Sequence, residues 1–214
     1  MNITLFGATG TTGPYLIEEG LKRGHQITVF ARSQSSFYHP NVRTVRGNIT
    51  DIEVLREAIR NADIVISALG PTQIPHPKNM PIYEATQAII RAMKEEQVNR
   101  LIAVSTGTAA DPDDGFDFKI KLPAVIIKYA LPAIYNDIVK LADAIRKSDL
   151  NWTMVRVGFL NNSPASPHLN VGHYGKTKHS LSLSREDLAK FMFDQAISSE
   201  YLTQAPGLSS GLRN

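Results

Sequence analysis

Three glycines near the start of the chain have the spacing of a phosphate-binding turn. Gly7-Ala-Thr-Gly10-Thr-Thr-Gly13 directly follows a short apolar run and opens a stretch with helical periodicity. Glycine lets the backbone approach a pyrophosphate, and the following helix N-terminus offers free N–H donors and positive potential. The spacing is GxxGxxG and not GxGxxG, yet we expect the same dinucleotide-binding chemistry; the alternative is a tight strand-to-helix turn without a ligand. Three threonines can add hydroxyl donors: Thr9, Thr11 and Thr12.

The residues after the second apolar run bear on the choice of dinucleotide. NAD sites usually place Asp or Glu about 20 residues beyond the turn to hold the ribose, whereas NADP sites drop that acid and place Arg nearby. Here the residues are Phe30-Ala31-Arg32-Ser33-Gln34, with an arginine and no acid. This pattern predicts NADPH over NADH as the cofactor; the alternative is that Arg32 is a solvated surface charge.

The elements that must position these residues alternate between strands and helices. Runs rich in branched residues predict strands at Ile3–Phe6, Gln26–Ala31, Val42–Arg46, Ile64–Ala68, Leu101–Ser105 and Trp152–Val157. Apolar residues at three-to-four spacing predict helices at Pro14–Arg23, Asp51–Arg60, Pro81–Gln97, Ile134–Lys147 and Arg185–Ile197. The alternation predicts an α/β fold with a Rossmann-type doubly wound parallel sheet, in a single domain over residues 1–214.

Two segments break this alternation. Residues 107–132 hold an acidic stretch followed by an apolar one, and their length predicts a lid or an interface element. The apolar part contains Pro123 and Lys128 and is shorter than the roughly 20 residues of a membrane span, so no transmembrane segment is expected. Residues 161–181 are rich in Asn, Ser, Pro and His, which predicts a loop.

Composition narrows the classes of partner. The chain has 23 Lys and Arg against 20 Asp and Glu, and a net charge of +3 is too small to predict a nucleic-acid groove. It has no cysteine, which excludes disulfides, thiolate metal sites and thiol nucleophiles. The fold pattern begins at Met1 without an export signal, so we expect a cytoplasmic protein with neither membrane nor nucleic-acid partner.

Further motifs lie at the ends of the predicted strands. They are Gly47-Asn48-Ile49, Ser67-Ala68-Leu69-Gly70, Val104-Ser105-Thr106 and Trp152-Thr-Met-Val-Arg156. Together with the glycine turn and Arg32, they resemble the atypical short-chain dehydrogenase/reductase superfamily nearly end to end. Within it, the chain is most similar to the small NAD(P)H-binding group that contains flavin reductase/biliverdin-IXβ reductase and bacterial NADH-flavin reductases.

The resemblance implies roles for these strand ends. Asn48 and Ile49 would flank the adenine, and Ala68, Leu69 and Gly70 would line the ribose and nicotinamide side. Val104 would end the fifth strand beside the nicotinamide, together with the candidate catalytic residues Ser105 and Thr106, for which a capping or turn role is the alternative. The candidate substrate pocket adds Arg156, Gly158 and Phe159.

The chain departs from the mainstream superfamily in lacking a Tyr and a Lys four apart on one helix. Tyr135 and Lys140 are five apart, so on a helix they point to different faces. In the flavin-reductase group, chemistry depends mainly on the cofactor delivering hydride to a stacked, electron-poor ring. We therefore predict an NADPH-dependent oxidoreductase, monomeric or homodimeric, that transfers hydride to a flat acceptor such as a flavin or a quinone. The alternative is a non-enzymatic NADP(H)-binding redox sensor.

The other polar residues and the single tryptophan have the following interpretations. Arg156 either meets an anionic substrate or pairs with an acid of the 107–132 segment. His168, His173 and His179 match no compact metal motif and have no neighbouring acid in sequence, so no metal is predicted. Trp152 is expected in the core, and Asp137, like Asp143, on the solvated face of its helix.

Overall fold

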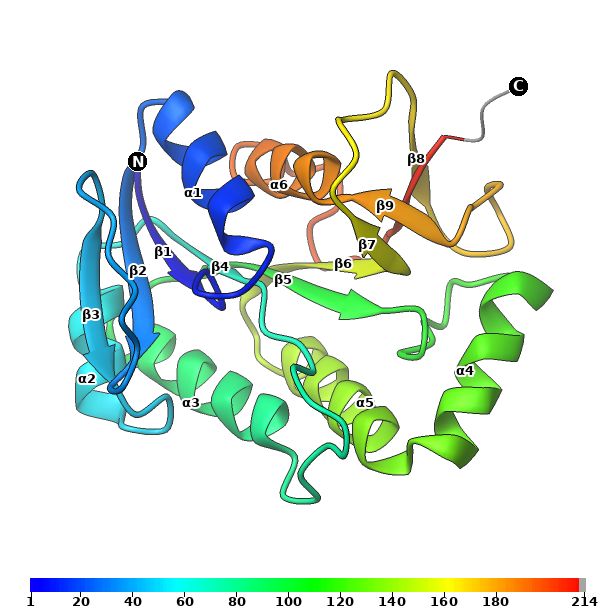
Figure 1. Ribbon diagram of the computed structural model, residues 1–214, viewed down its shortest axis with the longest axis horizontal. Coiled ribbons are helices and arrows are strands. Elements are labelled where there is room, and N and C mark those ends of the chain that lie inside the picture. The colour runs from blue at the N-terminus through cyan, green and yellow to red at the C-terminus, as the bar shows by residue number, and fades with distance from the viewer. Residues whose placement is uncertain (212–214) are drawn as a thin grey trace.

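The apolar runs pair side by side in a mostly parallel central sheet (Figure 1). The computed structural model describes residues 1–211, and the sheet has the strand order β3-β2-β1-β4-β5-β6-β10-β8. Every neighbouring pair in it is parallel except β8 and β10. The strands are β1 (Asn2–Phe6), β2 (Gln26–Arg32), β3 (Arg43–Gly47), β4 (Ile64–Ser67), β5 (Arg100–Thr106), β6 (Asn151–Val157), β8 (Leu169–Gly172) and β10 (Gly207–Ser210). With β1 beside β4, this is the doubly wound Rossmann order that the sequence predicted.

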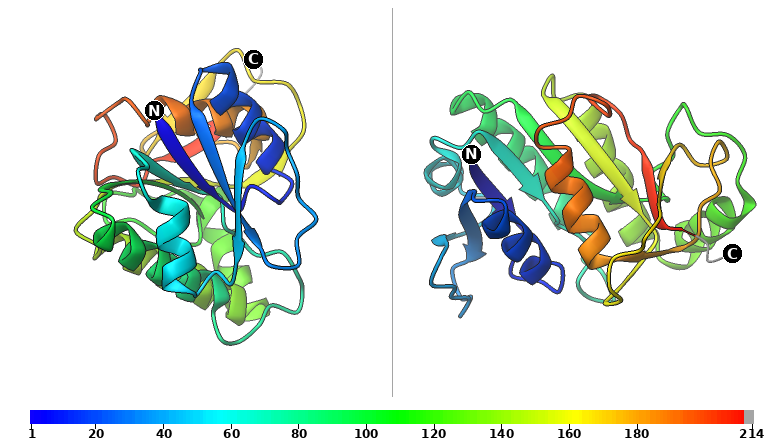
Figure 2. Two further views of the ribbon diagram at one scale, coloured as in Figure 1. Left: turned by 90° about the vertical axis from the view of Figure 1, so that its left-hand side faces the viewer. Right: turned by 90° about the horizontal axis from the view of Figure 1, so that it is seen from above.

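Helices cover both faces of the sheet (Figures 1 and 2). One face carries α1 (Gly13–Lys22) and α6 (Arg185–Asp194); the other carries α2 (Ile52–Ile59), α3 (Pro81–Glu95) and α5 (Pro132–Arg146). Alternate residues of each strand enter opposite cores, as Leu5 and Phe6 show, because successive side chains of a strand point to opposite faces. Trp152 is only 7% exposed in the core beneath α3 and α5, which confirms its predicted place.

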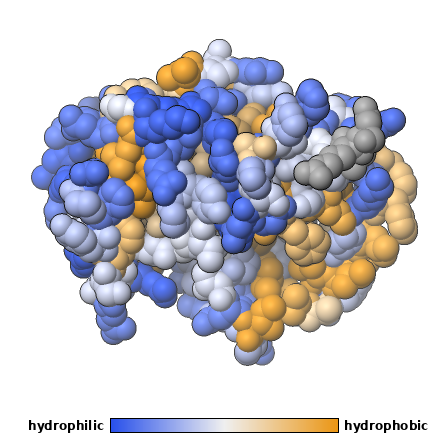
Figure 3. Space-filling model, turned by 45° about the horizontal axis from the view of Figure 1, so that its top comes forward, coloured by the Kyte–Doolittle hydropathy of each residue, from blue (hydrophilic) through white to orange (hydrophobic). Residues whose placement is uncertain are grey.

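The segment 107–132 forms a loop and then helix α4 (Phe118–Ala130), which packs against α5. None of the residues of α4 is buried. Figure 3 shows hydrophobic residues gathered on this end of the molecule. The large apolar side chains exposed on the helix are Phe118, Leu122, Val125, Ile126 and Tyr129. Within residues 1–211, no single helix could cross a membrane; α4 and α5 reach the required length and apolarity only together, and their axes bend by 119°.

The prediction of a loop over residues 161–181 is wrong for part of this segment. Its residues Leu169–Gly172 form β8, which pairs antiparallel with β10. A second, two-stranded sheet joins β7 (Phe159–Asn161) to β9 (Ser182–Ser184), the strand that leads into α6. The Ser184 side chain accepts a hydrogen bond from the N–H of Asp187 and so caps α6.

Candidate functional site

A cleft of about 660 Å³ lies at the carboxyl ends of the parallel strands, where β1 and β4 diverge into helices on opposite faces. Ligands of open α/β sheets bind at this reversal of strand order. The volume is within the range of small-molecule sites, about 300–1,000 Å³. Most of the residues predicted to bind cofactor or substrate line it: Gly7, Thr9, Gly10, Thr11, Thr12, Arg32, Ile49, Ala68, Leu69, Gly70, Val104, Thr106, Gly158 and Phe159.

Packing alone requires two glycines of the opening turn. Gly7 has φ +78°, and a Cβ on it would lie 2.7 Å from the carbonyl of Ala68 at the end of β4. A Cβ on Gly13 would lie 1.6 Å from the carbonyl oxygen of Ala8, so α1 can approach the turn only with glycine here. Gly10, by contrast, has no contact shorter than 3.4 Å at its missing Cβ. The turn is therefore fixed by Gly7 and Gly13, and Gly10 leaves its backbone open to the cleft.

The turn also presents hydrogen-bond donors that have no acceptor within residues 1–211. The N–H groups of Thr11 and Thr12, and the hydroxyls of Thr9, Thr11 and Thr12, are unpaired there. Thr12 is the N-cap of α1 and makes no side-chain capping bond. Unpaired N–H groups at a helix N-terminus form a site for an anion. The geometry therefore fits a pyrophosphate.

Arg32, at the end of β2, lies on the wall of the same cleft with its side chain exposed. Its guanidinium forms no ion pair with any residue that the structure describes, although most arginines of the chain are paired. The acid that would hold a ribose in an NAD site is absent from the end of β2. The position is thus compatible with a phosphate on the ribose.

Four predicted site residues lie off the cleft wall: Gly13, Asn48, Ser105 and Arg156. The side chain of Ser105 points into the core, is 1% exposed, and leaves its Oγ without a partner in the described structure. The prediction that Ser105 acts on a ligand is not met by this geometry, because residues alternate in a strand and its neighbours Val104 and Thr106 face the cleft. Asn48 also lies off the wall, and its Oδ1 accepts hydrogen bonds from the N–H and hydroxyl of Thr50.

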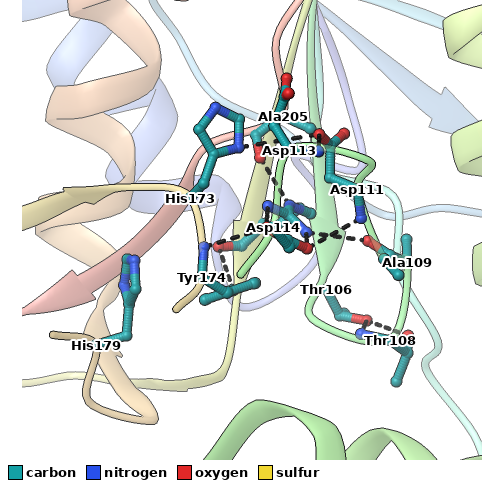
Figure 4. Close-up of polar contacts among 12 residues, drawn as sticks. Thr106, Thr108, Ala109, Asp111, Asp113, Asp114, His173, Tyr174, His179 and Ala205 are labelled. Carbon is teal, nitrogen blue, oxygen red and sulfur yellow. Dashed lines mark hydrogen bonds and ion pairs between the residues drawn. The ribbon is translucent and has the colours of Figure 1, made fainter. Parts of the chain in front are cut away.

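Arg156 is not in the substrate pocket. The interpretation that it meets an anionic substrate is therefore wrong. Its side chain is fully buried, and Nη1 and Nη2 donate to the two carboxylate oxygens of Asp114 at 2.5 and 2.6 Å. Nε donates to the carbonyl of Ala205 at 2.7 Å. Figure 4 shows Asp114 beside Tyr174, whose N–H donates to Asp114 Oδ1 and whose hydroxyl donates to the carbonyl of Arg156. Arg156 therefore anchors the 107–132 segment, as the pairing alternative proposed.

The electrostatics of this cluster favour the ion pair between Asp114 and Arg156. Partial burial opposes ionisation of Asp114, but hydrogen bonds from Arg156 and from the N–H of Asp111 outweigh it and hold its pKa below the usual value. Burial raises the pKa of the Tyr174 hydroxyl, so this group stays protonated and donates. No residue of 107–132 lines the cleft, so the segment does not form a lid in this structure.

His173 has acids beside it in the folded chain, although none neighbours it in the sequence. The loop brings Asp111 and Asp113 to it, and ligand atoms of the three residues lie within 4.8 Å of one another (Figure 4). Asp111 already pairs with Arg146 at 3.0 Å. His179 has a structural role instead: it is buried and hydrogen-bonded to Asn170, Thr177 and Ser209, and to the carbonyl of Gly172.

Sequence reasoning missed a pair of residues beside the cleft. His76 lines its wall from the β4–α3 connection, and its Nε2 lies 2.7 Å from Oδ2 of Asp137 on α5. Asp137 is completely buried, so its predicted solvated position is wrong. A signal was present: Asp137 lies three residues after Ile134 and four before the buried Leu141, on the apolar stripe of its helix. A charged residue on that stripe requires a buried partner.

A doubly wound sheet with an open, donor-rich glycine turn where the strand order reverses defines a dinucleotide-binding protein of the Rossmann type. Comparison with known families agrees with this class. The chain belongs to the NAD(P)H-binding family, whose model matches residues 7–198.

The chain is also similar to individual relatives and solved structures. The chain is 26% identical to YwnB of Bacillus subtilis over 155 residues, covering 72% of this chain and 70% of YwnB. It is 28% identical over 152 residues to the isoflavone reductase homolog A622-like of Nicotiana tabacum, covering 62% of this chain but only 46% of that protein. A short-chain dehydrogenase/reductase of Veillonella parvula in complex with NADP superposes with a TM-score of 0.77 at 21% identity, over 97% of this chain and 94% of that one. ChuY, an anaerobilin reductase of Escherichia coli O157:H7, superposes with a TM-score of 0.76 at 19% identity over the whole of both chains.

Proposed function

We propose that this protein is an NADPH-dependent oxidoreductase that reduces a flat, conjugated acceptor such as a flavin or a quinone. One observation carries the proposal: a single cleft combines the unpaired donors of the glycine turn, the unpaired guanidinium of Arg32 and an apolar end beyond Gly70. The names of the relatives agree with this class of reaction, since several plant relatives and ChuY are reductases.

The preference for NADPH follows from Arg32. A guanidinium can bind a phosphate through two parallel hydrogen bonds, and charge-assisted bonds of this kind contribute about 1.5–3 kcal/mol each. NADH lacks the phosphate and would gain none of this. The Veillonella parvula structure, described as a complex with NADP, supports the same choice for a protein of this fold.

The acceptor class follows from the other end of the cleft. Its walls there are largely apolar, with Pro71, Pro77, Ile82 and Leu160 among the lining residues. Phe159 lies at this end with 71% of its surface exposed, so its ring is free to stack on a flat molecule. ChuY, which has a similar fold, is named as a reductase of anaerobilin, a further small-molecule acceptor.

The chain itself supplies binding and orientation. A bound NADPH would supply a hydride. The glycine turn, Arg32 and the strand ends of β4 and β5 are the groups that would hold the dinucleotide. Thr106 is the hydroxyl residue on the wall at this point, and its Oγ1 lies 2.5 Å from that of Thr108. We propose that Thr106 positions the nicotinamide and does not transfer a proton.

The test is NADPH oxidation, followed by nicotinamide absorbance, with menadione and with flavin mononucleotide as acceptors. Arg32→Ala is expected to raise KM for NADPH about 10–100-fold, the effect of losing about 1.4–3 kcal/mol, and to change KM for NADH less than threefold. The matched control is Arg43→Ala, an exposed arginine that pairs with Glu57 away from the cleft. If the protein binds NADP(H) tightly but oxidises NADPH with no flavin and no quinone, the redox-sensor alternative replaces the proposal.

A further inference from the structure

The connection from β4 to α3 places a histidine against a buried carboxylate beside the cleft. His76 Nε2 is 2.7 Å from Asp137 Oδ2, and their side chains are 4% and 0% exposed. Asp137 Oδ2 also accepts the N–H of Ile82 at 3.1 Å, and Oδ1 accepts that of Tyr83 at 2.7 Å, both in the first turn of α3. The carboxylate is therefore fixed by three groups from two elements other than its own helix.

These contacts determine which nitrogen of the imidazole carries the proton. Both carboxylate oxygens of Asp137 already accept backbone N–H groups, so we take the carboxylate as the acceptor and Nε2 of His76 as the donor. In the neutral ring, Nδ1 is then the basic nitrogen. Nδ1 is buried and has no hydrogen-bond partner in the described structure, although the residue lines the cleft. A buried polar atom without a partner carries a cost in free energy, and a group entering the cleft can supply the partner.

We propose that His76 is the proton donor for the acceptor, and that Asp137 positions it and stabilises its protonated form; this rests on the oxidoreductase proposed above. The arrangement of a buried carboxylate, an imidazole and a second ring nitrogen without a partner is the one that enzymes use to move a proton at a fixed point. It supplies the acid that the missing Tyr-Lys pair provides elsewhere in the superfamily.

A proton from His76 needs an oxygen atom to receive it, so the proposed acceptor carries a conjugated carbonyl group. A quinone is the simplest acceptor of this kind. One carbonyl oxygen of the quinone takes the hydride from NADPH, which becomes NADP⁺; the ring electrons rearrange to the aromatic pattern, and the π electron pair of the second C=O bond moves to its oxygen. That oxygen takes the proton from Nδ1 of His76, so the N–H bond breaks and the O–H bond of the hydroquinone forms. The imidazole is left neutral, with Nε2–H still bound to Asp137, and solvent returns a proton after the product leaves.

The first experiment needs no turnover. Protein labelled with ¹⁵N-histidine and loaded with NADP⁺ is titrated with menadione, and the His76 signals are assigned by their loss in His76→Gln. The expected result is an Nε2–H tautomer and a menadione-dependent shift of the His76 Nδ1 resonance. Asp137→Asn, whose amide can donate to Nε2, is expected to convert the ring to the Nδ1–H tautomer, whereas Asp143→Asn, on the same helix and 47% exposed, is not. An Nδ1–H tautomer in the wild type, or no shift with menadione, overturns the proposal.

The second experiment is kinetic. His76→Gln retains an amide that can bind Asp137 but has no titratable proton, and it is expected to lower kcat for menadione about 100-fold with KM changed less than threefold. His168→Gln, at an exposed histidine off the cleft, is expected to keep wild-type kcat. A kcat for His76→Gln within twofold of wild type refutes the proton-donor role alone. Failure of the wild-type protein to oxidise NADPH refutes the proposed function instead, and the tautomer and shift measurements remain decisive for His76.

Discussion

Removing the carboxylate of Asp114 is expected to destabilise the protein strongly, because it leaves the guanidinium of Arg156 buried and uncompensated. Asp114 accepts two hydrogen bonds from Arg156 at 2.5 and 2.6 Å, one from the N–H of Tyr174 at 3.1 Å and one from that of Asp111 at 3.0 Å. Breaking a buried ion pair on one side costs about 3–5 kcal/mol. Arg156 keeps its bonds to the carbonyls of Ala109 and Ala205, so we expect the lower end, about 3 kcal/mol, for Asp114→Ala.

The measurement is urea unfolding followed by circular dichroism, with Asp113→Ala as the control. Asp113 is exposed and one residue away, so its loss is expected to change the free energy of unfolding by less than about 0.5 kcal/mol. The double variant Asp114→Leu with Arg156→Met replaces both charges by apolar groups and is expected to be more stable than Asp114→Ala. A loss below about 1 kcal/mol for Asp114→Ala would refute the view that this pair anchors the 107–132 segment.

Three further predictions follow from packing and burial. Gly13→Ala is expected to abolish dinucleotide binding and lower the melting temperature, because its Cβ would overlap the carbonyl of Ala8; thermal unfolding with and without NADP⁺ measures both. Ile126→Ser on α4 is expected to change the free energy of unfolding by less than about 0.5 kcal/mol, since that side chain is 55% exposed, whereas Ile138→Ser at 2% exposure is expected to lose about 3 kcal/mol. Burial lowers the pKa of His179 below 6.5, so its contribution to stability is complete above that pH and is lost as the pH falls; the fall in urea midpoint from about pH 7.5 to pH 5.5 is expected to be smaller in His179→Gln.

The parallel part of the fold could be predicted from the sequence because its strands and helices have different hydrophobic periods. The strands β1 to β6 and the helices α1, α2, α3, α5 and α6 all lie within two or three residues of the predicted ranges. The last strand, β10, has the sequence Gly-Leu-Ser-Ser, in which small residues give no alternation. It is specified by its pairing with β6 and β8, contacts that local sequence does not encode.

The part of the site that the backbone of the glycine turn forms could be predicted from the sequence. Glycines before a helix and an arginine in place of an acid are local signals, and they identified the donor-rich part of the cleft wall, namely Gly7, Thr9, Gly10, Thr11, Thr12 and Arg32. The long-range pairs were not predictable in the same way. Asp114 lies 42 residues before Arg156, and His76 lies 61 residues before Asp137, so only the folded chain brings each pair together.

The most direct test of the central claim is calorimetric titration of the purified protein with NADPH and with NADH at one ionic strength. The structure predicts that NADPH binds at least tenfold more tightly, and that Arg32→Ala removes this difference while Arg43→Ala preserves it. Equal or tighter binding of NADH, or no binding of either dinucleotide, would contradict the assignment of the glycine turn and Arg32 to a phosphorylated dinucleotide.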